Sequence, residues 1–450
     1  MIRLWQNILK LGVWKWLERL GGRSTHDVIA AVQKHASLDE EDRLTERREL
    51  LVSLVAEAYR NVPFYNNLKN HAPPCEGLSF LCGIPVVSKD ELRACAEDFV
   101  SESCDQIPGK SVSGGSTGVP VTSFSDPAAP EIVKAAIIEG RAWWNIHPWS
   151  RCLSVWGHSK YMGAGWKESI KLGKQRALDA FANRRVIPAY DLSEEAVRRF
   201  NRAWHKDGPD YILGYASALY EIARVHRDLG LPIPAKECLV MTTGEVLHDW
   251  QEEVIEEVMG CKVIEEYGLV EAGAVAYTHP QGDGLKIIRS HFILEILDDE
   301  DEPVSCGQEG RIAITSLRRR QVPVIRYDTG DRAVCLDEAG GFDCSHISKV
   351  QGRAYDIIRK TDGTAVPGVI FTHAVKPLQQ LDRFQIVQHE LGGVVIYYTS
   401  AQQVDAATLE AVAAKICKEI GQDFKVSFEQ VAELEAARSG KYRWICSEVN

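Results

Sequence analysis

Apolar and polar positions recur along this chain with two different periods, and each period predicts a different element. Between residues 38 and 68 apolar side chains keep helical spacing as far as Val62, and Pro63 disfavours further helix. We therefore expect a long surface helix there. Further on, helical patterns alternate with short apolar runs at 152–157, 237–244 and 262–268. Strands and helices in alternation are typical of parallel sheets covered by helices.

The sequence pattern changes after about residue 285. Strand-like runs divided by acidic or glycine-containing turns continue to residue 331, which predicts an antiparallel or barrel-like subdomain. The last hundred or so residues place strand patterns around a helical pattern at 405–421, as in a small α+β domain. We therefore expect an α/β fold with two domains. Residues 1–352 form a large domain of helix-covered β-sheets with a β-barrel-like subdomain, and residues 353–450 form the small domain.

Composition and charge narrow the class of protein. The 450 residues suffice for two or three domains at roughly 150 residues each. A net charge of −11 with neutral histidines repels a phosphate backbone, which disfavours general nucleic-acid binding. The twelve cysteines contain no CxxC pair, and scattered thiols of this kind suit a reducing compartment. We expect a cytoplasmic monomer or homodimer.

The N-terminal residues 1–22 combine apolar side chains near helical spacing with basic residues between them. The segment has no apolar run long enough to span a membrane and no small-residue cleavage site, so it fits neither a transmembrane helix nor a signal peptide. An amphipathic helix of this kind either docks on its own domain or makes peripheral contact with a membrane surface. Both alternatives stay open.

A loop at residues 111–120 concentrates hydroxyls and glycines ahead of a helical pattern. Glycines let backbone amides approach an anion closely, and hydroxyls add further donors, so such a loop suits phosphate binding. It is not a Walker motif, because no lysine follows the last glycine. Alone the loop is weak evidence, since most loops of this composition bind nothing.

Further segments follow that loop in order along the chain. They are Thr242-Thr243-Gly244-Glu245, Glu266-Tyr267-Gly268-Leu269-Val270-Glu271, Arg326-Tyr327-Asp328-Thr329-Gly330-Asp331, Gly352-Arg353 with Asp356, and Ser439-Gly440-Lys441. Together they resemble the signatures of the adenylate-forming superfamily of acyl-CoA synthetases, peptide-synthetase adenylation domains and luciferases. The segments at 62–67, 84–92 and 214–219 are most similar to the phenylacetate-CoA ligase group, and capsule-biosynthesis-type relatives are nearest.

The resemblance implies a role for each matching position. Tyr267 offers adenine a flat face, and Asp331 accepts from the ribose hydroxyls, although a tyrosine there ordinarily packs in a core and such an aspartate commonly forms a turn. Glu271 holds Mg²⁺ together with Thr117. The phosphate cradle comprises Ser113, Gly114, Gly115, Ser116, Thr117 and Gly118. The adenine and ribose site comprises Gly244, Glu245, Glu266, Tyr267, Gly268 and Asp331.

The implied mechanism centres on a mobile C-terminal domain. That domain brings the catalytic Lys441 to the acid and the α-phosphate and then swings away so that acyl transfer follows. Arg353 is a further catalytic candidate beside the boundary. Tyr355 stands at the hinge where relatives have a charged residue, which puts the domain rotation in doubt.

The implied activity is ATP-dependent formation of an acyl-adenylate with release of pyrophosphate, followed by acyl transfer. Coenzyme A is the acceptor that the resemblance favours. Two alternatives remain: an amide-forming synthetase that delivers the acyl group to an amine or a carrier protein, and a silent acyl- or nucleotide-binding homologue. Aromatic residues suit a flat or apolar acid, and the expected acid pocket comprises Trp156, His158, Tyr161, Tyr215 and Thr243.

Overall fold

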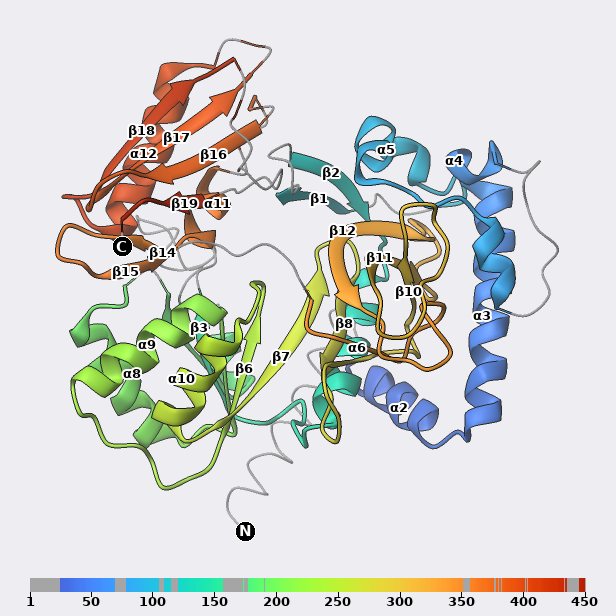
Figure 1. Ribbon diagram of the computed structural model, residues 1–450, viewed down its shortest axis with the longest axis horizontal. Coiled ribbons are helices and arrows are strands. Elements are labelled where there is room, and N and C mark those ends of the chain that lie inside the picture. The colour runs from blue at the N-terminus through green and yellow to red at the C-terminus, as the bar shows by residue number, and fades with distance from the viewer. Residues whose placement is uncertain are drawn as a thin grey trace. The chain divides into compact units, whose positions relative to one another are not determined.

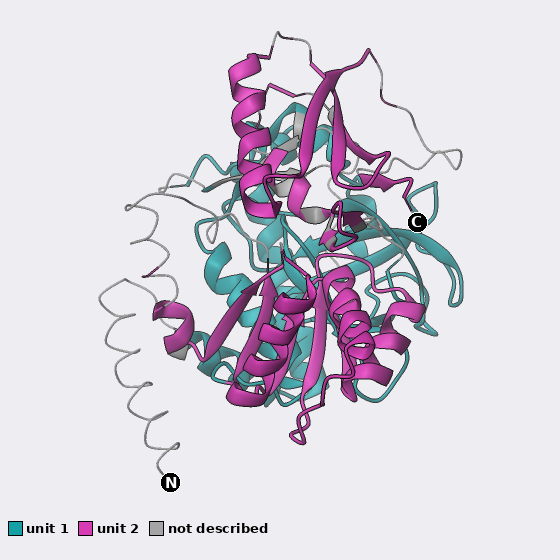
Figure 2. Ribbon diagram, turned by 90° about the vertical axis from the view of Figure 1, so that its left-hand side faces the viewer, with its two compact units in different colours: residues 1–111, 122–149, 266–351 teal, residues 112–121, 150–265, 352–450 magenta. Residues whose placement is uncertain are grey.

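The computed structural model describes most of the chain as two compact units, drawn in Figure 1 and coloured separately in Figure 2. Unit 1 comprises residues 1–111, 122–149 and 266–351, and unit 2 comprises residues 112–121, 150–265 and 352–450. The described residues are 25–68, 78–104, 109–114, 120–156, 173, 177–189, 191–350, 357–375, 378, 380–381, 383–400, 402, 404–432, 434 and 445–449.

Helices dominate the N-terminal part of unit 1. The predicted long helix is confirmed as α3, which begins after Asp39, whose carboxylate accepts from the Asp42 N–H at 2.8 Å, and ends just before Pro63. Such a cap satisfies one of the free N–H groups of a helix start. The helices of this unit are α2 (Thr25–Ala36), α3 (Glu40–Asn61), α4 (Pro63–Asn66), α5 (Lys89–Ala94) and α6 (Ala129–Ala142), with 3₁₀ turns η2 (Ser79–Gly83) and η3 (Ala96–Phe99).

The β-rich part of unit 1 is antiparallel, as the sequence predicts. One sheet has the order β10-β11-β12, with Leu294 opposite Ile314 and both side chains fully buried. In the other, β8 pairs with the end of β7 and with β9, and β9 pairs with β13. The strands are β7 (Lys262–Leu269), of which residues 266–269 belong to unit 1, β8 (Gly273–Thr278), β9 (Leu285–Ile287), β10 (Phe292–Leu297), β11 (Glu309–Ser316), β12 (Tyr327–Val334) and β13 (His346–Ile347).

Unit 2 contains the predicted parallel strands, in the order β4-β3-β5-β6. Figure 1 shows α8, α9 and α10 side by side over these strands, and their apolar faces meet the sheet around Phe200, Trp204 and Ile222. The elements are β3 (Cys152–Trp156), β4 (Arg184–Pro188), α8 (Glu194–Asp207), β5 (Tyr211–Gly214), α9 (Ala216–Asp228), β6 (Leu239–Thr243) and α10 (Asp249–Met259).

The C-terminal part of unit 2 has the predicted α+β composition. A mixed sheet of order β18-β17-β16-β19 carries α12. The predicted domain boundary at 352/353 lies outside the described residues and stays a prediction. The elements are β14 (Ile357–Arg359), β15 (Ala365–Pro367), α11 (Val369–Val375), β16 (Arg383–Gln388), β17 (Gly393–Thr399), α12 (Ala406–Ile420), β18 (Lys425–Gln430) and β19 (Ile445–Ser447).

Two further sequence predictions concern the loop at residues 111–120 and the amphipathic segment at residues 1–22. Of the predicted loop at 111–120, residues 111–114 belong to strand β1 (Gly109–Gly114) and Pro120 begins β2 (Pro120–Ser125), and these strands pair in a two-stranded sheet; residues 115–119 lie outside the described residues. The amphipathic segment 1–22 lies outside the described residues. Within the part of the chain that is described, every helix is too short or too polar to cross a membrane.

Candidate nucleotide and acid site

Strands β7 and β12 of unit 1 bring Tyr267 and Asp331 together. The phenol of Tyr267 is buried and donates to Oδ2 of Asp331 at 3.0 Å. Burial, together with the negative charge of Asp331, raises the pKa of Tyr267 well above its usual value, so the phenol keeps its proton and remains a donor. Of the adenine and ribose residues that the sequence singles out, these two meet directly.

The local backbone around Thr329 fixes Asp331. The buried Thr329 hydroxyl donates to the Ile312 carbonyl at 3.0 Å and accepts from the Asp331 N–H at 3.2 Å. Gly330 lies between them with φ +73°, a left-handed conformation that favours glycine, and its N–H donates to Asp328 at 2.7 Å. The Thr-Gly-Asp motif is therefore part of β12, within the β-rich region that the sequence predicts to continue to residue 331.

A buried ion pair holds the start of the same strand. The Arg326 guanidinium meets the Glu295 carboxylate through two bonds of 3.0 and 3.1 Å, and both side chains are almost fully buried. Arg326 also donates to the carbonyls of Cys82, Ile84 and Asp301 at 2.7–3.1 Å. A guanidinium with this many acceptors is well compensated for its loss of water. The arginine that precedes the motif thus anchors β12 to β10.

Glu266 is held by groups of the protein itself. One of its carboxylate oxygens accepts from the Arg141 guanidinium at 3.0 Å and from the Tyr277 hydroxyl at 2.6 Å. Gly268, two residues on, lies against the Gly273 carbonyl in the β7–β8 pair, where a side chain would collide. These contacts favour a structural role for both positions beside Tyr267.

Glu271 follows β7 in a turn and is half-buried. Sequence reasoning missed its neighbour Arg319, a buried guanidinium whose pKa is lowered by burial, while the charges of Asp126 and Glu271 oppose that shift. Its Nε has no hydrogen-bond partner within the part of the chain that the structure describes. A buried cation close to a carboxylate is the kind of group that meets phosphate oxygens. The run Arg318-Arg319-Arg320 was the only signal, and it does not say which arginine is buried.

In unit 2 the structure gathers four of the predicted residues at the ends of β3, β5 and β6. The rings of Trp156 and Tyr215 stack with centroids 4.7 Å apart and planes 17° from parallel. Gly244, with φ +79°, passes the Tyr215 ring so closely that a Cβ would lie 3.4 Å from it. Thr243, at the end of β6, is buried. This arrangement gives a flat aromatic wall beside a close-packed loop.

Glu245 belongs to the same cluster. Its carboxylate accepts from the Ser217 N–H at 2.9 Å, one of the free donors at the start of α9. Burial raises the pKa of Glu245 to about 7, although the Ser217 bonds oppose the shift. Glu245 therefore caps a helix and also places a carboxyl group that titrates near pH 7 beside the aromatic wall.

Other predicted site residues lie outside the described residues. For Ser113 and Gly114 the structure describes only the backbone, at the end of β1. Across the described ranges, no group of three or more His, Cys, Asp or Glu side chains is placed to hold a metal ion. The predicted residues beyond the described ranges are Gly115, Ser116, Thr117, Gly118, His158, Tyr161, Arg353, Tyr355 and Lys441.

Comparison with known proteins finds several that are named as coenzyme A ligases. Phenylacetate-coenzyme A ligase from Thermus thermophilus is 23% identical over 412 residues, which cover 86% of this chain and 85% of the relative. A solved 2-hydroxyisobutyryl-CoA ligase in complex with 2-HIB-AMP and CoA is 18% identical, with a TM-score of 0.58 and 91% of each chain covered. The chain therefore has the fold of the adenylate-forming enzymes.

The relatives also narrow the group within that superfamily. Protein CapK from Staphylococcus aureus is 19% identical over 400 residues, which cover 88% of this chain and 85% of the relative. Residues 358–448 match the family described as CapK C-terminal domain. The chain is thus related to the phenylacetate-CoA ligase-like group and to CapK, which confirms the resemblance that the motifs indicate.

Proposed function

We propose that this chain activates a carboxylic acid with ATP and passes the acyl group of the acyl-adenylate to the thiol of coenzyme A. The observation that carries the proposal is the bond between Tyr267 and Asp331, which joins two motifs 64 residues apart in the sequence. A shared nucleotide site accounts for that juxtaposition. Similarity in fold to a ligase solved with an acyl-AMP and CoA supports it.

The ribose of the nucleotide would bind in unit 1, at Asp331, through complementary donors and acceptors. Asp331 keeps lone pairs beyond the one used by Tyr267, and with these its carboxylate accepts from the ribose hydroxyls. The phosphates would lie in the cradle of residues 113–118. Glu271 and Thr117 would hold Mg²⁺, whose positive charge offsets the charge on the phosphates. Arg319 supplies a second, fixed positive charge near Glu271.

The acid would bind in unit 2 against the stacked rings of Trp156 and Tyr215. A flat or apolar body packs favourably on an aromatic wall. The acid's carboxylate then attacks the α-phosphorus in line, and pyrophosphate leaves with the electron pair of the broken P–O bond. Lys441 would offset the negative charge that grows on the carboxylate and the α-phosphate. Arg353, beside the predicted domain boundary, would be a further catalytic residue, and Tyr355 would be the hinge of the C-terminal domain.

The experiment that tests this proposal is incubation of the chain with ATP, Mg²⁺, coenzyme A and single carboxylic acids. We expect acyl-CoA and AMP to form together, in equal amounts, with an aromatic or short apolar acid. Mass spectrometry identifies the thioester. Hydrolysis of ATP to ADP, or AMP formation that does not depend on the acid, would contradict the proposal.

Asp331→Ala is expected to weaken ATP binding about 10- to 100-fold, because a lost hydrogen bond to a charged group costs about 1.5–3 kcal/mol. Those contacts exist in the ground state as well as in the transition state, so the KM for ATP rises more than kcat falls. Titration with ATP in steady-state and binding assays measures the change. Asp299→Ala, an exposed change in a turn of the same unit, is the control. Equal ATP affinity in all three proteins would refute the placement.

Glu245→Gln is expected to change how stability depends on pH. The folded chain holds the Glu245 proton up to about pH 7, whereas the unfolded chain releases it near 4.5. The carboxyl group therefore favours the folded state below pH 4.5, and this contribution is lost as pH rises through 7, by up to about 3 kcal/mol. Glutamine keeps an oxygen for the Ser217 N–H but does not titrate.

The difference in free energy of unfolding between variant and parent should therefore shift in favour of the variant between pH 5 and pH 8. Urea denaturation at the two pH values measures it. The exposed Glu253→Gln on α10 should show no such shift. A constant difference between the Glu245 variant and the parent would show that Glu245 titrates normally.

A further inference from the structure

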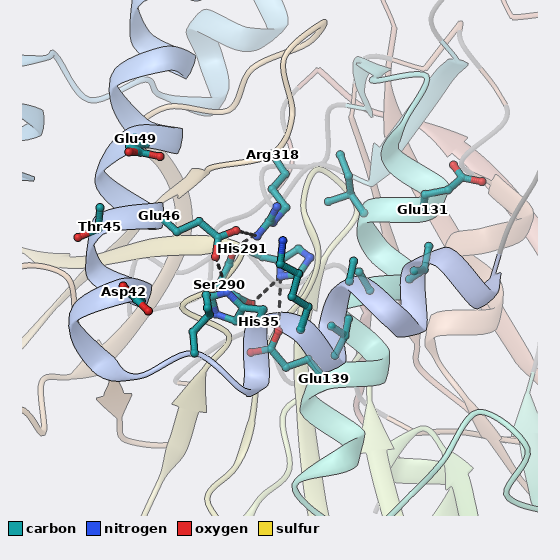
Figure 3. Close-up of a pocket in the computed structure, with 17 residues that line it drawn as sticks. His35, Asp42, Thr45, Glu46, Glu49, Glu131, Glu139, Ser290, His291 and Arg318 are labelled. Atoms are coloured by element: carbon teal, nitrogen blue, oxygen red, sulfur yellow. Dashed lines mark hydrogen bonds and ion pairs between the residues drawn. The ribbon is translucent and has the colours of Figure 1, made fainter.

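A cavity of about 780 Å³ lies in unit 1 between α2, α3 and α6. None of the residues that line it belongs to the candidate nucleotide and acid site. Figure 3 shows one end of the cavity, where Glu46, His35, Ser290, His291 and Glu139 come together from different elements. The volume is in the range of small-molecule sites.

A chain of hydrogen bonds, called the relay below, determines which atoms at that end of the cavity donate and which accept. The Ser290 hydroxyl donates to Oε2 of Glu139 at 2.5 Å, so its oxygen is left to accept from Nδ1–H of His291 at 2.8 Å. A histidine that carries its proton on Nδ1 presents a lone pair on Nε2. Burial lowers the pKa of His291 to about 3, which keeps the ring neutral. Nε2 is therefore an acceptor.

That acceptor has no hydrogen-bond partner among the described residues, although the His291 side chain is only 4% exposed and lines the cavity. A buried polar atom without a partner costs about 1–3 kcal/mol, which a donor on a ligand removes. Glu139 lies 3.9 Å from the ring and lines the same cavity. His291 and Glu139 therefore place two acceptor groups in the lining of one cavity, and a ligand with N–H donors complements them.

The remaining lining specifies the rest of the ligand. The carboxyl groups around the cavity outnumber its two permanently charged cations, Lys34 and Arg318, and Arg318 is already paired with Glu46 at 3.0 Å. This excess favours a cation over an anion. The apolar lining comes mainly from α2 and α6, through Val28, Ala31, Val32, Ile132 and Ala135. The carboxyl groups are those of Asp42, Glu46, Glu49, Glu131 and Glu139.

We propose that this cavity binds a small amphipathic amine. Its ammonium group donates to Nε2 of His291 beside the Glu139 carboxylate, and its hydrocarbon part packs on the apolar faces of α2 and α6. The ammonium charge also stabilises the ionised form of Glu139, against the burial that raises the pKa of this group. This site is independent of the proposed ligase activity and uses different residues.

The test is isothermal titration of the full chain with hexylamine and phenethylamine, without ATP or acid. Hexanol and hexanoate serve as ligands of matched length without the positive charge. We expect the amines to bind at least ten times more tightly than hexanol, and hexanoate not to bind. Equal affinities for hexylamine and hexanol or hexanoate, or no binding of either amine, would overturn the proposal.

Variants place the binding in this cavity. Ala135→Phe fills the space between α2 and α6 and should abolish amine binding, whereas Gln33→Ala, an exposed change on α2 that does not line the cavity, should leave it unchanged. Glu139→Gln should weaken binding at least tenfold. Circular dichroism checks the fold of each variant, and Ala135→Phe leaves the buried polar relay intact. Unchanged affinity in a folded Ala135→Phe variant would exclude this cavity as the site.

Discussion

Lys441→Ala is expected to lower the rate of acid-dependent adenylation at least about 100-fold while the chain folds and binds ATP nearly as the parent does. A positive charge that meets the reacting carboxylate and α-phosphate only as their charge grows stabilises the transition state alone. Such a loss lowers kcat and leaves the affinity for ATP almost unchanged. Single-turnover release of pyrophosphate and a separate ATP titration measure the two quantities.

The control for this prediction is Lys418→Ala, an exposed lysine on α12 of the same C-terminal region. It removes the same charge from the chain, so a general electrostatic effect would appear in both variants. The prediction requires a large loss in the Lys441 variant and parental activity in the Lys418 variant. Parental activity in both variants would remove Lys441 from the mechanism.

Arg326→Met is expected to lower the free energy of unfolding by about 3–5 kcal/mol, because it leaves the Glu295 carboxylate buried without its partner. The burial of Glu295 already raises the pKa of this group against the opposing charge of Arg326. Urea denaturation measures the loss. The double variant with Glu295→Leu should recover a large part of it, since no unpaired charge then remains in the core.

The matched control is Arg332→Met, which removes an arginine from the same strand. Its bond to Glu309 is short, 2.6 Å, but both side chains are more than a third exposed, and exposed pairs contribute only about 0–1 kcal/mol. We therefore expect little change in stability. A similar small effect for Arg326→Met would show that the buried pair does not anchor β12.

Much of the fold was predictable because its signals are local. The helical spacing before Pro63 predicted α3, and the apolar runs at 237–244 and 262–268 predicted the strands β6 and β7. The interior charge pair was not predictable in the same way. Glu295 interrupts an apolar run, yet nothing near it in sequence points to Arg326, 31 residues away, whose side chain neutralises it.

The candidate site shows the same division between local and non-local information. Motif order singled out Tyr267 and Asp331, and the structure joins them by a hydrogen bond. The order of the motifs does not predict that Glu245 caps α9 or that Arg319 is the buried member of three consecutive arginines. Burial and helix capping depend on tertiary contacts, and the residues next to a position in the sequence do not reveal those contacts.

The amine cavity had no sequence signal. Helix α2 was not predicted, and the relay joins Glu139 to Ser290 across 151 residues. Ser290 and His291 stand in the stretch after residue 285 that the sequence predicts to be strand-like, and the significance of the pair depends on the carboxyl group that binds the serine. Sites assembled from three elements in this way become visible only once the packing of the helices is known.

The most direct test of the ligase proposal is to follow heavy oxygen from a labelled carboxylic acid into the products. Formation of an acyl-adenylate and its attack by a thiol leave one carboxylate oxygen on the AMP that departs. We predict labelled AMP, unlabelled pyrophosphate and, when coenzyme A is present, a thioester. Transfer from labelled acid to an amine but not to coenzyme A would replace the acceptor while keeping the first step. Turnover of the acid with label in inorganic phosphate, or with unlabelled AMP, would contradict adenylation itself.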